Sequence, residues 1–268
     1  MRQFIAPKVP AVLLFFWVTK LLTTGIGESA ADYLAFRSKA VFALVSLVGF
    51  AGALWWQLRS DRYHPIRYWL AVLMVAVFGT AIADGPHQVL SMPYWMTSAG
   101  CFLALLAVLG WWYRAEGTLS VHSVVTSRRE MYYWLTVLLT FGLGTALGDL
   151  TASTLKLGYE GSIGLFGLLI LVPLALWRAG AGAVACFWSA YVLTRPLGAS
   201  VADWLGKPTA GTKVATGGAH AGYGLGWGDA TVTTIGLVLF VGLVAYAAIT
   251  HSDEDHAAMH GALAPAEA

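Results

Sequence analysis

The sequence predicts an all-α integral membrane protein with eight transmembrane helices, arranged as four tandem helical hairpins. The first observation is composition: 58% of the 268 residues are hydrophobic and 11% are charged, whereas roughly 25% are charged in a soluble domain. The second is that apolar stretches reach about 20 residues, enough to cross a bilayer as a helix. The third is an internal repeat. We therefore expect a single membrane domain over residues 1–250, embedded in a lipid bilayer.

The repeat consists of four segments that align without gaps: WVTKLLTTGIGESAAD, WLAVLMVAVFGTAIAD, WLTVLLTFGLGTALGD and WSAYVLTRPLGASVAD. Each segment begins with Trp, ends with Asp fifteen residues later, and has Gly five residues before that Asp. The matching positions are Trp17, Trp69, Trp134 and Trp188; Gly27, Gly79, Gly144 and Gly198; and Asp32, Asp84, Asp149 and Asp203.

A second apolar segment follows each motif, so that every copy contributes two spans. The motif helices are expected over about 10–35, 66–84, 130–154 and 181–205, and the second helices over 39–58, 95–114, 161–178 and 229–250. The copies themselves cover about 10–60, 61–116, 128–179 and 181–250, and a polar tail at 251–268 is expected to be disordered. With two spans in each copy, all motif helices run in one direction, which predicts pseudo-symmetry about the membrane normal.

The distribution of Lys and Arg near the span ends predicts the orientation. The amino-terminal side holds Arg2, Lys8, Arg59, Arg62, Arg67, Arg114, Arg128, Arg129 and Arg178. The opposite side holds Arg37, Lys39, Lys156, Lys207 and Lys213. Because cytoplasmic loops are enriched in basic residues, we expect a multi-pass protein of the cell inner membrane with both termini in the cytoplasm.

The chain resembles a bacterial family of uncharacterised membrane-anchored proteins built from four tandem copies of a repeat of unknown function, each with two transmembrane segments and a characteristic tryptophan. The resemblance covers about residues 10–250 and rests on the shared Trp, Gly and Asp positions. It implies the architecture and no particular activity. Two copies depart from the common pattern, because Glu28 and Ala199 stand where the other two copies have Thr80 and Thr145.

The repeated aspartates are costly in a membrane. An ionised Asp at the centre of a transmembrane helix costs about 2.5 to 3.5 kcal/mol on insertion scales, so partners or water must compensate. If the motif helices line the middle of the protein, the four aspartates form a ring or two facing pairs near the outer mouth. The four repeat glycines would then allow the backbones to approach closely.

The first copy adds a polar stripe, because Lys20, Thr24, Glu28 and Asp32 follow one another at four-residue steps. Lys20 and Arg195 are the two basic residues expected inside the membrane, as internal counter-charges. Carboxylate and hydroxyl oxygens suit hard cations such as Mg²⁺, Ca²⁺ and Mn²⁺. The expected ion-binding residues are Glu28, Asp32, Asp84, Asp149, Asp203, Thr80, Thr145 and Ser200.

Transport of a cation is therefore the first functional hypothesis, with a divalent metal ion as the first candidate and exchange for protons as an option. The five acids would be the metal ligands, and His87, which follows Asp84 closely, is a further candidate ligand beside its simpler interpretation as polar surface. The alternative is a scaffold without transport, in which the same charges fix the packing of the copies. The identity of the ion and the oligomeric state stay open.

Other classes of function find less support. A net charge of +2 does not indicate a nucleic-acid-binding protein. Cys101 and Cys186 lie in apolar segments and form neither a disulfide framework nor a spaced metal motif. The sequence has no catalytic Ser, His and Asp set and no nucleotide motif, so we expect neither an enzyme nor a tightly bound cofactor. An enzyme acting on lipid-linked substrates would need a nucleophile or a metal beside a lateral opening.

Overall fold

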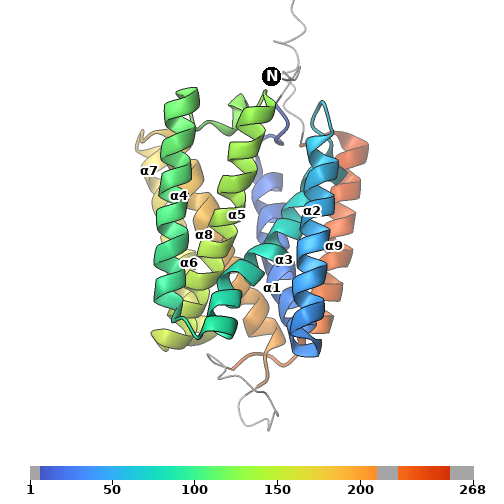
Figure 1. Ribbon diagram of the computed structural model, residues 1–268, viewed down its shortest axis with the longest axis vertical. Coiled ribbons are helices and arrows are strands. Elements are labelled where there is room, and N and C mark those ends of the chain that lie inside the picture. The colour runs from blue at the N-terminus through green and yellow to red at the C-terminus, as the bar shows by residue number, and fades with distance from the viewer. Residues whose placement is uncertain (1–6, 210–222, 254–268) are drawn as a thin grey trace, which may run out of the picture.

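The computed structural model describes residues 7–209 and 223–253, and within them every regular element is helical. Long helices lie side by side along one axis (Figure 1). Their bounds are α1 Leu14–Arg37, α2 Lys39–Leu58, α3 Pro65–Leu90, α4 Tyr94–Glu116, α5 Ser127–Asp149, α6 Gly158–Leu169, α7 Leu171–Arg178, α8 Ala183–Gly206 and α9 Asp229–Thr250, with short segments η1 Val121–Ser123 and η2 Leu150–Thr154. The expected all-helical fold is confirmed, and the predicted tail lies outside the described residues from position 254 onward.

Side-chain caps mark the beginnings of α2 and α5, and a glycine marks the end of α4. The hydroxyl of Ser38 accepts a hydrogen bond from the backbone N–H of Val41 at the start of α2, and Thr126 does the same for Arg129 at the start of α5. Such side chains satisfy backbone donors that have no partner within the helix. Gly117 ends α4 in the left-handed conformation, with φ of 70°, which glycine adopts without strain.

The second helix of the third copy differs from the sequence-based prediction. It was expected as one span over 161–178, but it is divided at Ile170 into α6 and α7. Pro173 lies in the first turn of α7 and has no N–H to donate to the carbonyl of Leu169, so the regular hydrogen-bond ladder is interrupted there. The motif helix of the second copy also continues past Asp84 to Leu90, beyond its predicted end.

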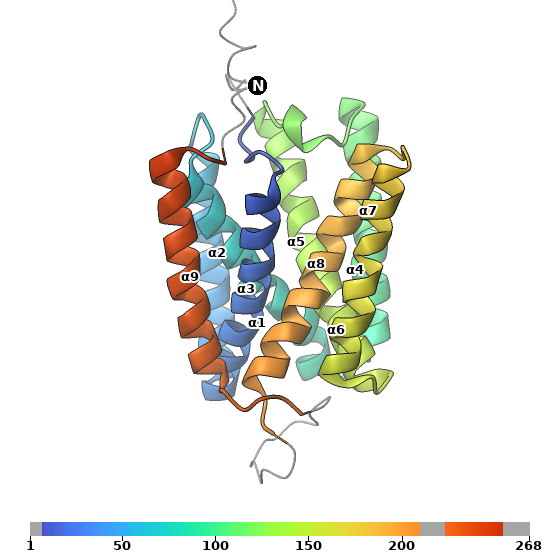
Figure 2. The same ribbon diagram turned by 180° about the vertical axis from the view of Figure 1, so that it is seen from behind.

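Four helices form the centre of the bundle. In Figures 1 and 2, α1, α3, α5 and α8 lie between α2 and α9 on one side and α4, α6 and α7 on the other. Within their apolar stretches, 61% of α3 and 67% of α5 is buried, against 17 to 28% in the outer helices. The motif helices therefore form an inner ring with neighbours in the order α1, α3, α5, α8 and back to α1.

The outer helices repeat one packing pattern around this ring. Each of them packs chiefly on the inner helix of the following copy: α2 on α3, α4 on α5, and α6 and α7 on α8. The last outer helix, α9, closes the circle by packing chiefly on α1. The four copies are thus arranged cyclically.

The repeat glycines show that this cyclic arrangement holds at the level of single residues. A Cβ atom built on Gly27 would lie 2.4 Å from Ala76 Cβ, one on Gly79 would lie 2.6 Å from Phe141 Cβ, and one on Gly144 would lie 2.5 Å from Arg195 Cβ. For Gly198 the nearest atom is Thr24 Oγ1, at 1.7 Å. In each case the contacted residue stands eight positions before the Asp of the next copy. Each repeat glycine therefore allows close packing against the next inner helix, where a larger side chain would clash.

The composition of the helices supports a membrane protein. Among the described residues, six helical segments are long and apolar enough to cross a membrane: α2, α3, α4, α5 with η2, α6 with α7, and α9. Helices α1 and α8 are not among them, and they carry Glu28, Asp32, Arg195 and Asp203. The described ends of the chain meet at one end of the bundle, where the N–H of Ala11 donates to the carbonyl of Asp253 at 2.8 Å.

Candidate functional site

A buried guanidinium lies at the centre of the inner ring. Arg195 of α8 is fully buried, and its Nη2 lies 2.7 Å from Glu28 Oε2 of α1. The same guanidinium donates to the hydroxyl of Thr80 on α3 and, at 2.6 Å, to the backbone carbonyl of Thr24. One side chain therefore ties together helices from the first, second and fourth copies. A charge-assisted pair of this kind is stronger than a neutral hydrogen bond.

A second cationic group lies nearer the carboxyl ends of the inner helices. Lys207 follows the last residue of α8, and its Nζ forms ion pairs with Asp32 of α1, with Asp203 of α8 at 3.7 Å and with Asp229 of α9 at 3.2 Å. Burial acts to lower the pKa of Lys207, but attraction to Asp32, Asp203 and Asp229 outweighs it and raises that pKa above its ordinary value. Lys207 is thus held as an ammonium ion among three carboxylates.

Three of the predicted acidic residues converge at this point. Glu28, Asp32 and Asp203 each offer a carboxylate oxygen, and these oxygens lie within 4.8 Å of one another. Exposure of the side chains decreases along the row, from 26% for Asp32 through 12% for Asp203 and 5% for Glu28 to zero for Arg195. The three-carboxylate group therefore opens toward one end of the bundle, and the buried guanidinium of Arg195 lies at its inner end.

The other two repeat aspartates lie on neighbouring inner helices. Asp84 on α3 and Asp149 on α5 are close enough to interact electrostatically with each other and with Glu28 and Asp32. Oδ1 of Asp84 has no hydrogen-bond partner among the described residues. The four aspartates thus share one region of the inner ring.

The remaining predicted ligands lie around this region with other partners. Thr145 donates to the carbonyl of Phe141 in its own helix, at 3.2 Å, and Ser200 is buried on α8. His87 stacks on Tyr94, with 4.1 Å between ring centroids, and its Nδ1 lies 2.8 Å from the carbonyl of Met92. Among the described residues, His87 does not join the group of possible metal ligands.

Lys20, the other predicted counter-charge, does not reach the acids. It is 1% exposed, and its Nζ lies 3.8 Å from the ring centroid of Phe141 and 4.2 Å from that of Tyr191. This ammonium nitrogen has no hydrogen-bond partner within the part of the chain that the structure describes. The group is held between two aromatic faces, an arrangement that attracts a cation through the ring quadrupoles.

Aromatic side chains close the axis on the side of the chain ends. The residues sixteen positions before each repeat Asp are Phe16, Tyr68, Tyr133 and Phe187. The hydroxyls of Tyr68 and Tyr133 lie 2.5 Å apart, and Phe16 packs on Phe187 with 6.0 Å between ring centroids. These contacts place aromatic side chains across the inner ring on that side of the acidic region.

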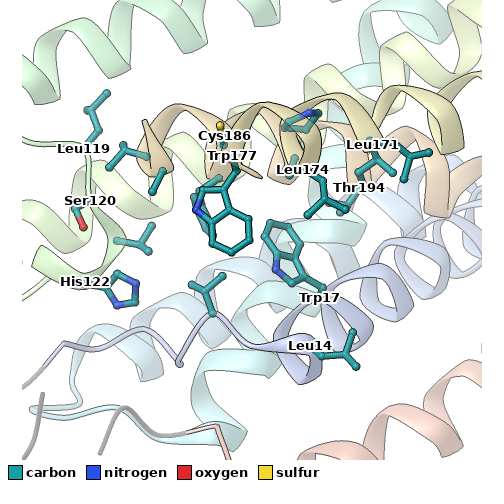
Figure 3. Close-up of a pocket in the computed structure, with 18 of the residues that line it drawn as sticks. Leu14, Trp17, Leu119, Ser120, His122, Leu171, Leu174, Trp177, Cys186 and Thr194 are labelled. Carbon is teal, nitrogen blue, oxygen red and sulfur yellow. The ribbon is translucent and has the colours of Figure 1, made fainter. Parts of the chain in front are cut away.

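An apolar pocket lies apart from the acids. It has a volume of about 630 Å³ and lies between α1, α7 and the beginning of α8, beside the segment that precedes α5. In Figure 3 the indoles of Trp17 and Trp177 project toward each other from α1 and α7. No carboxylate lines the pocket, so it lacks the ligands that the acidic region offers to a hard cation. Its lining suits an apolar chain such as that of a lipid.

Sequence reasoning missed two members of the acidic site. Lys207 was counted only as a basic residue outside the membrane, and Asp229 was left out of the site. A signal for Lys207 was present, because it stands four residues after Asp203 and therefore lies on the same helix face. Asp229 gave no such signal, because its proximity depends on how α9 packs against α1 and α8.

Comparison with known proteins agrees with the repeat. The profile of DUF347, described as a Repeat of Unknown Function, matches residues 15–63, 67–118, 132–180 and 186–253, which is most of the chain. No curated protein and no solved structure matches it. The four matched segments each contain one Trp, Gly and Asp motif and the outer helix that follows. The chain therefore belongs to the DUF347 family of repeat proteins, as its resemblance to a four-repeat family predicted.

Proposed function

We propose that the protein spans the inner membrane with eight helices and transports a divalent cation through the acidic region of its inner ring. The observation that carries this proposal is the convergence of Glu28, Asp32 and Asp203, whose carboxylate oxygens lie within 4.8 Å of one another inside a bundle of apolar helices. Several carboxylate oxygens around one point are the ligands that Ca²⁺, Mg²⁺ and Mn²⁺ prefer.

The charge of the region supports this proposal. Glu28, Asp32, Asp84, Asp149, Asp203 and Asp229 would contribute six negative charges if all were ionised. Arg195 and Lys207 compensate two of these charges. The remainder favours a bound cation, because uncompensated like charges repel strongly where water is scarce. With both chain ends in the cytoplasm, the site faces outward.

The aromatic layer formed by Phe16, Tyr68, Tyr133 and Phe187 sets a requirement on the mechanism. A cation bound near Asp203 can proceed only if Tyr68, Tyr133 and their neighbours part, so transport needs a second conformation that opens toward the chain ends. Cyclic repeats are suited to such a movement, since two copies can rock against the other two around a fixed site. In this mechanism Asp84 and Asp149 are the carboxyl groups that would carry the exchanged protons.

The test is flux into proteoliposomes that contain the purified protein. Uptake of Mg²⁺, Ca²⁺, Mn²⁺ and Zn²⁺ is measured with and without a pH gradient. We expect uptake of at least one of these ions and its loss in Asp203→Asn and Asp32→Asn. Glu160→Gln is the matched control, because Glu160 is an exposed acid at the same end that contacts Trp204 outside the group. Unchanged flux in Asp84→Asn, Asp149→Asn and Asp203→Asn would contradict the acidic pathway.

A scaffold without transport is the second candidate. Arg195 favours it, because this one guanidinium joins α1, α3 and α8 and so fixes the packing of three copies. The two candidates differ in what the acids do. In a scaffold, the purified protein binds no divalent ion, and replacement of Asp32 or Asp203 lowers thermal stability without any change in ion binding.

A further inference from the structure

We propose that Lys207 is a tethered competitor for the cation site, occupying the carboxylates when no ion is bound and leaving them when a divalent ion enters. This inference rests on the proposed function. It assigns Lys207 a role in ion selection, because the ammonium group of Lys207 and the incoming ion require the same oxygens. Asp32 and Asp203 belong both to the ion pairs of Lys207 and to the three-carboxylate group.

The Lys207 ammonium group and a divalent ion cannot favourably occupy the same carboxylates at the same time. An ion held by Glu28, Asp32 and Asp203 would lie within a few ångströms of the Lys207 ammonium, because each group contacts the same two aspartates. Two positive charges at such a separation repel strongly where the dielectric constant is well below that of water. Binding of the ion therefore requires the lysine side chain to move away.

The surrounding backbone allows that movement without unfolding. The N–H of Lys207 donates to the carbonyl of Asp203 at 2.8 Å, and the carbonyl of Lys207 accepts from Gly226 at 2.9 Å. Residues just before α9 also donate to neighbouring carbonyls: the N–H of Trp227 donates to the carbonyl of Leu205 at 3.0 Å. The main chain of Lys207 is thus fixed at both sides, and rotation of its flexible side chain suffices. The side chain is 13% exposed, so it already borders solvent.

Arg195 cannot act in this way. It is fully buried and is held by Glu28, Thr80 and the carbonyl of Thr24. A rigid planar guanidinium with several partners stays in place, whereas a lysine is a single charge on a flexible stem. The site therefore has one permanent cation and one exchangeable cation.

This arrangement favours divalent ions. A monovalent ion that replaced the Lys207 ammonium would exchange one positive charge for another, with little electrostatic gain. A divalent ion adds a charge to a region that has negative charge in excess, and it is drawn more strongly to the same oxygens. The ligand class is therefore a hard divalent cation, with Mn²⁺ as a convenient probe.

The experiment is Mn²⁺ binding to the purified full-length protein, measured by the loss of the free-ion electron paramagnetic resonance signal. We expect Lys207→Gln to bind Mn²⁺ at least about tenfold more tightly than the wild type, because one competing charge is gone. Lys156→Gln is the matched control: it removes an exposed lysine at the same end, beyond the described contacts of the acids, and we expect its affinity to equal that of the wild type. Should Lys207→Gln fail to fold, the double variant Lys207→Gln with Asp229→Asn preserves the local net charge, and we expect it to bind Mn²⁺ more tightly than Asp229→Asn alone.

The possible outcomes distinguish failure of this inference from failure of the proposed function. If the wild type binds Mn²⁺ and Asp203→Asn abolishes binding, but Lys207→Gln binds with equal or lower affinity, Lys207 only fastens α1, α8 and α9 together and the inference is overturned while the site stands. If neither the wild type nor Lys207→Gln binds Mn²⁺, Mg²⁺ or Ca²⁺, the proposed function is overturned together with the inference.

Discussion

Gly198 of α8 lies against Thr24 of α1 so closely that a Cβ atom on the glycine would come within 1.7 Å of Thr24 Oγ1. Thr24 also accepts a hydrogen bond from Arg195 through its carbonyl, at 2.6 Å. This close approach of α8 to α1 is therefore next to the buried cation of the ring. Any separation of α1 from α8 at this level disturbs the contacts of Arg195.

The first prediction follows from this contact. Gly198→Ala should lower the melting temperature of the purified protein markedly, because the added methyl group meets a packed side chain and backbone with no room to yield. Gly148→Ala is the control: its Cβ would meet Pro196 at 3.8 Å, an ordinary contact. That variant should be as stable as the wild type or more so, since alanine favours a helix by about 1 kcal/mol over glycine. Equal melting temperatures for the two variants would refute the close packing.

The second prediction concerns the pair of Arg195 and Glu28. Replacing either one leaves the other buried without its ion-pair partner, so Arg195→Met and Glu28→Met should each destabilise the protein by about 3 to 5 kcal/mol. The double variant Arg195→Met with Glu28→Met removes both charges and should recover much of that loss. Thermal unfolding followed by tryptophan fluorescence gives the three values. Strictly additive effects would show that the two side chains do not interact.

The third prediction concerns Lys20, which is buried between Phe141 and Tyr191 without a hydrogen-bond partner in the described structure. Methionine has a similar length and lacks the polar nitrogen, whose burial costs free energy when it is unpaired. Lys20→Met should therefore raise the melting temperature. A lower melting temperature would mean that the contacts with the two rings contribute more than the burial costs.

The fourth prediction is a pH dependence that rests on Lys207. Attraction to its carboxylates raises the pKa of Lys207 above its ordinary value even though burial opposes this, and that ordinary value is about 10.4. The ammonium group is therefore charged at every pH below that range and loses its proton only as the pH rises through the elevated pKa. The ratio of Mn²⁺ affinities between Lys207→Gln and the wild type should then be equal at about pH 6.5 and about pH 8. A ratio that falls toward one at the higher pH would show that Lys207 loses its proton in this pH range, which would contradict the prediction.

The inner ring was predictable from the sequence because its cause is a repeat. Identical spacing of Trp, Gly and Asp in four copies requires equivalent surroundings, and Gly27, Gly79, Gly144 and Gly198 do contact equivalent positions. The partners of individual charges were not predictable in the same way. Lys20 and Glu28 share one helix face, yet Arg195 from another helix contacts Glu28 while Lys20 turns toward aromatic rings. Which cation meets which acid depends on the neighbouring helices, and these differ among the copies.

The last prediction concerns the end of the bundle where the chain ends meet. Lys8 precedes α1, yet it is buried at 1% exposure and its Nζ donates to Glu130 Oε2 of α5 at 2.5 Å. Gln57 at the end of α2 also donates to Glu130, at 3.3 Å. The segment that precedes the first copy thus supplies the counter-charge for a buried acid at the start of α5.

Lys8→Met should therefore destabilise the protein by about 3 kcal/mol, since it leaves Glu130 buried without its cationic partner. Glu130→Gln should cost less, because a neutral amide is easier to bury and Lys8, which lies outside the helices, can turn its ammonium toward water. Lys39→Met, which removes an exposed lysine at the other end of the bundle, serves as the control and should have the melting temperature of the wild type. If Lys8→Met also has the melting temperature of the wild type, the ion pair does not hold the amino-terminal segment in place. Movement of that segment would then cost little, and the aromatic layer beside it could open toward the chain ends without breaking a buried charge pair.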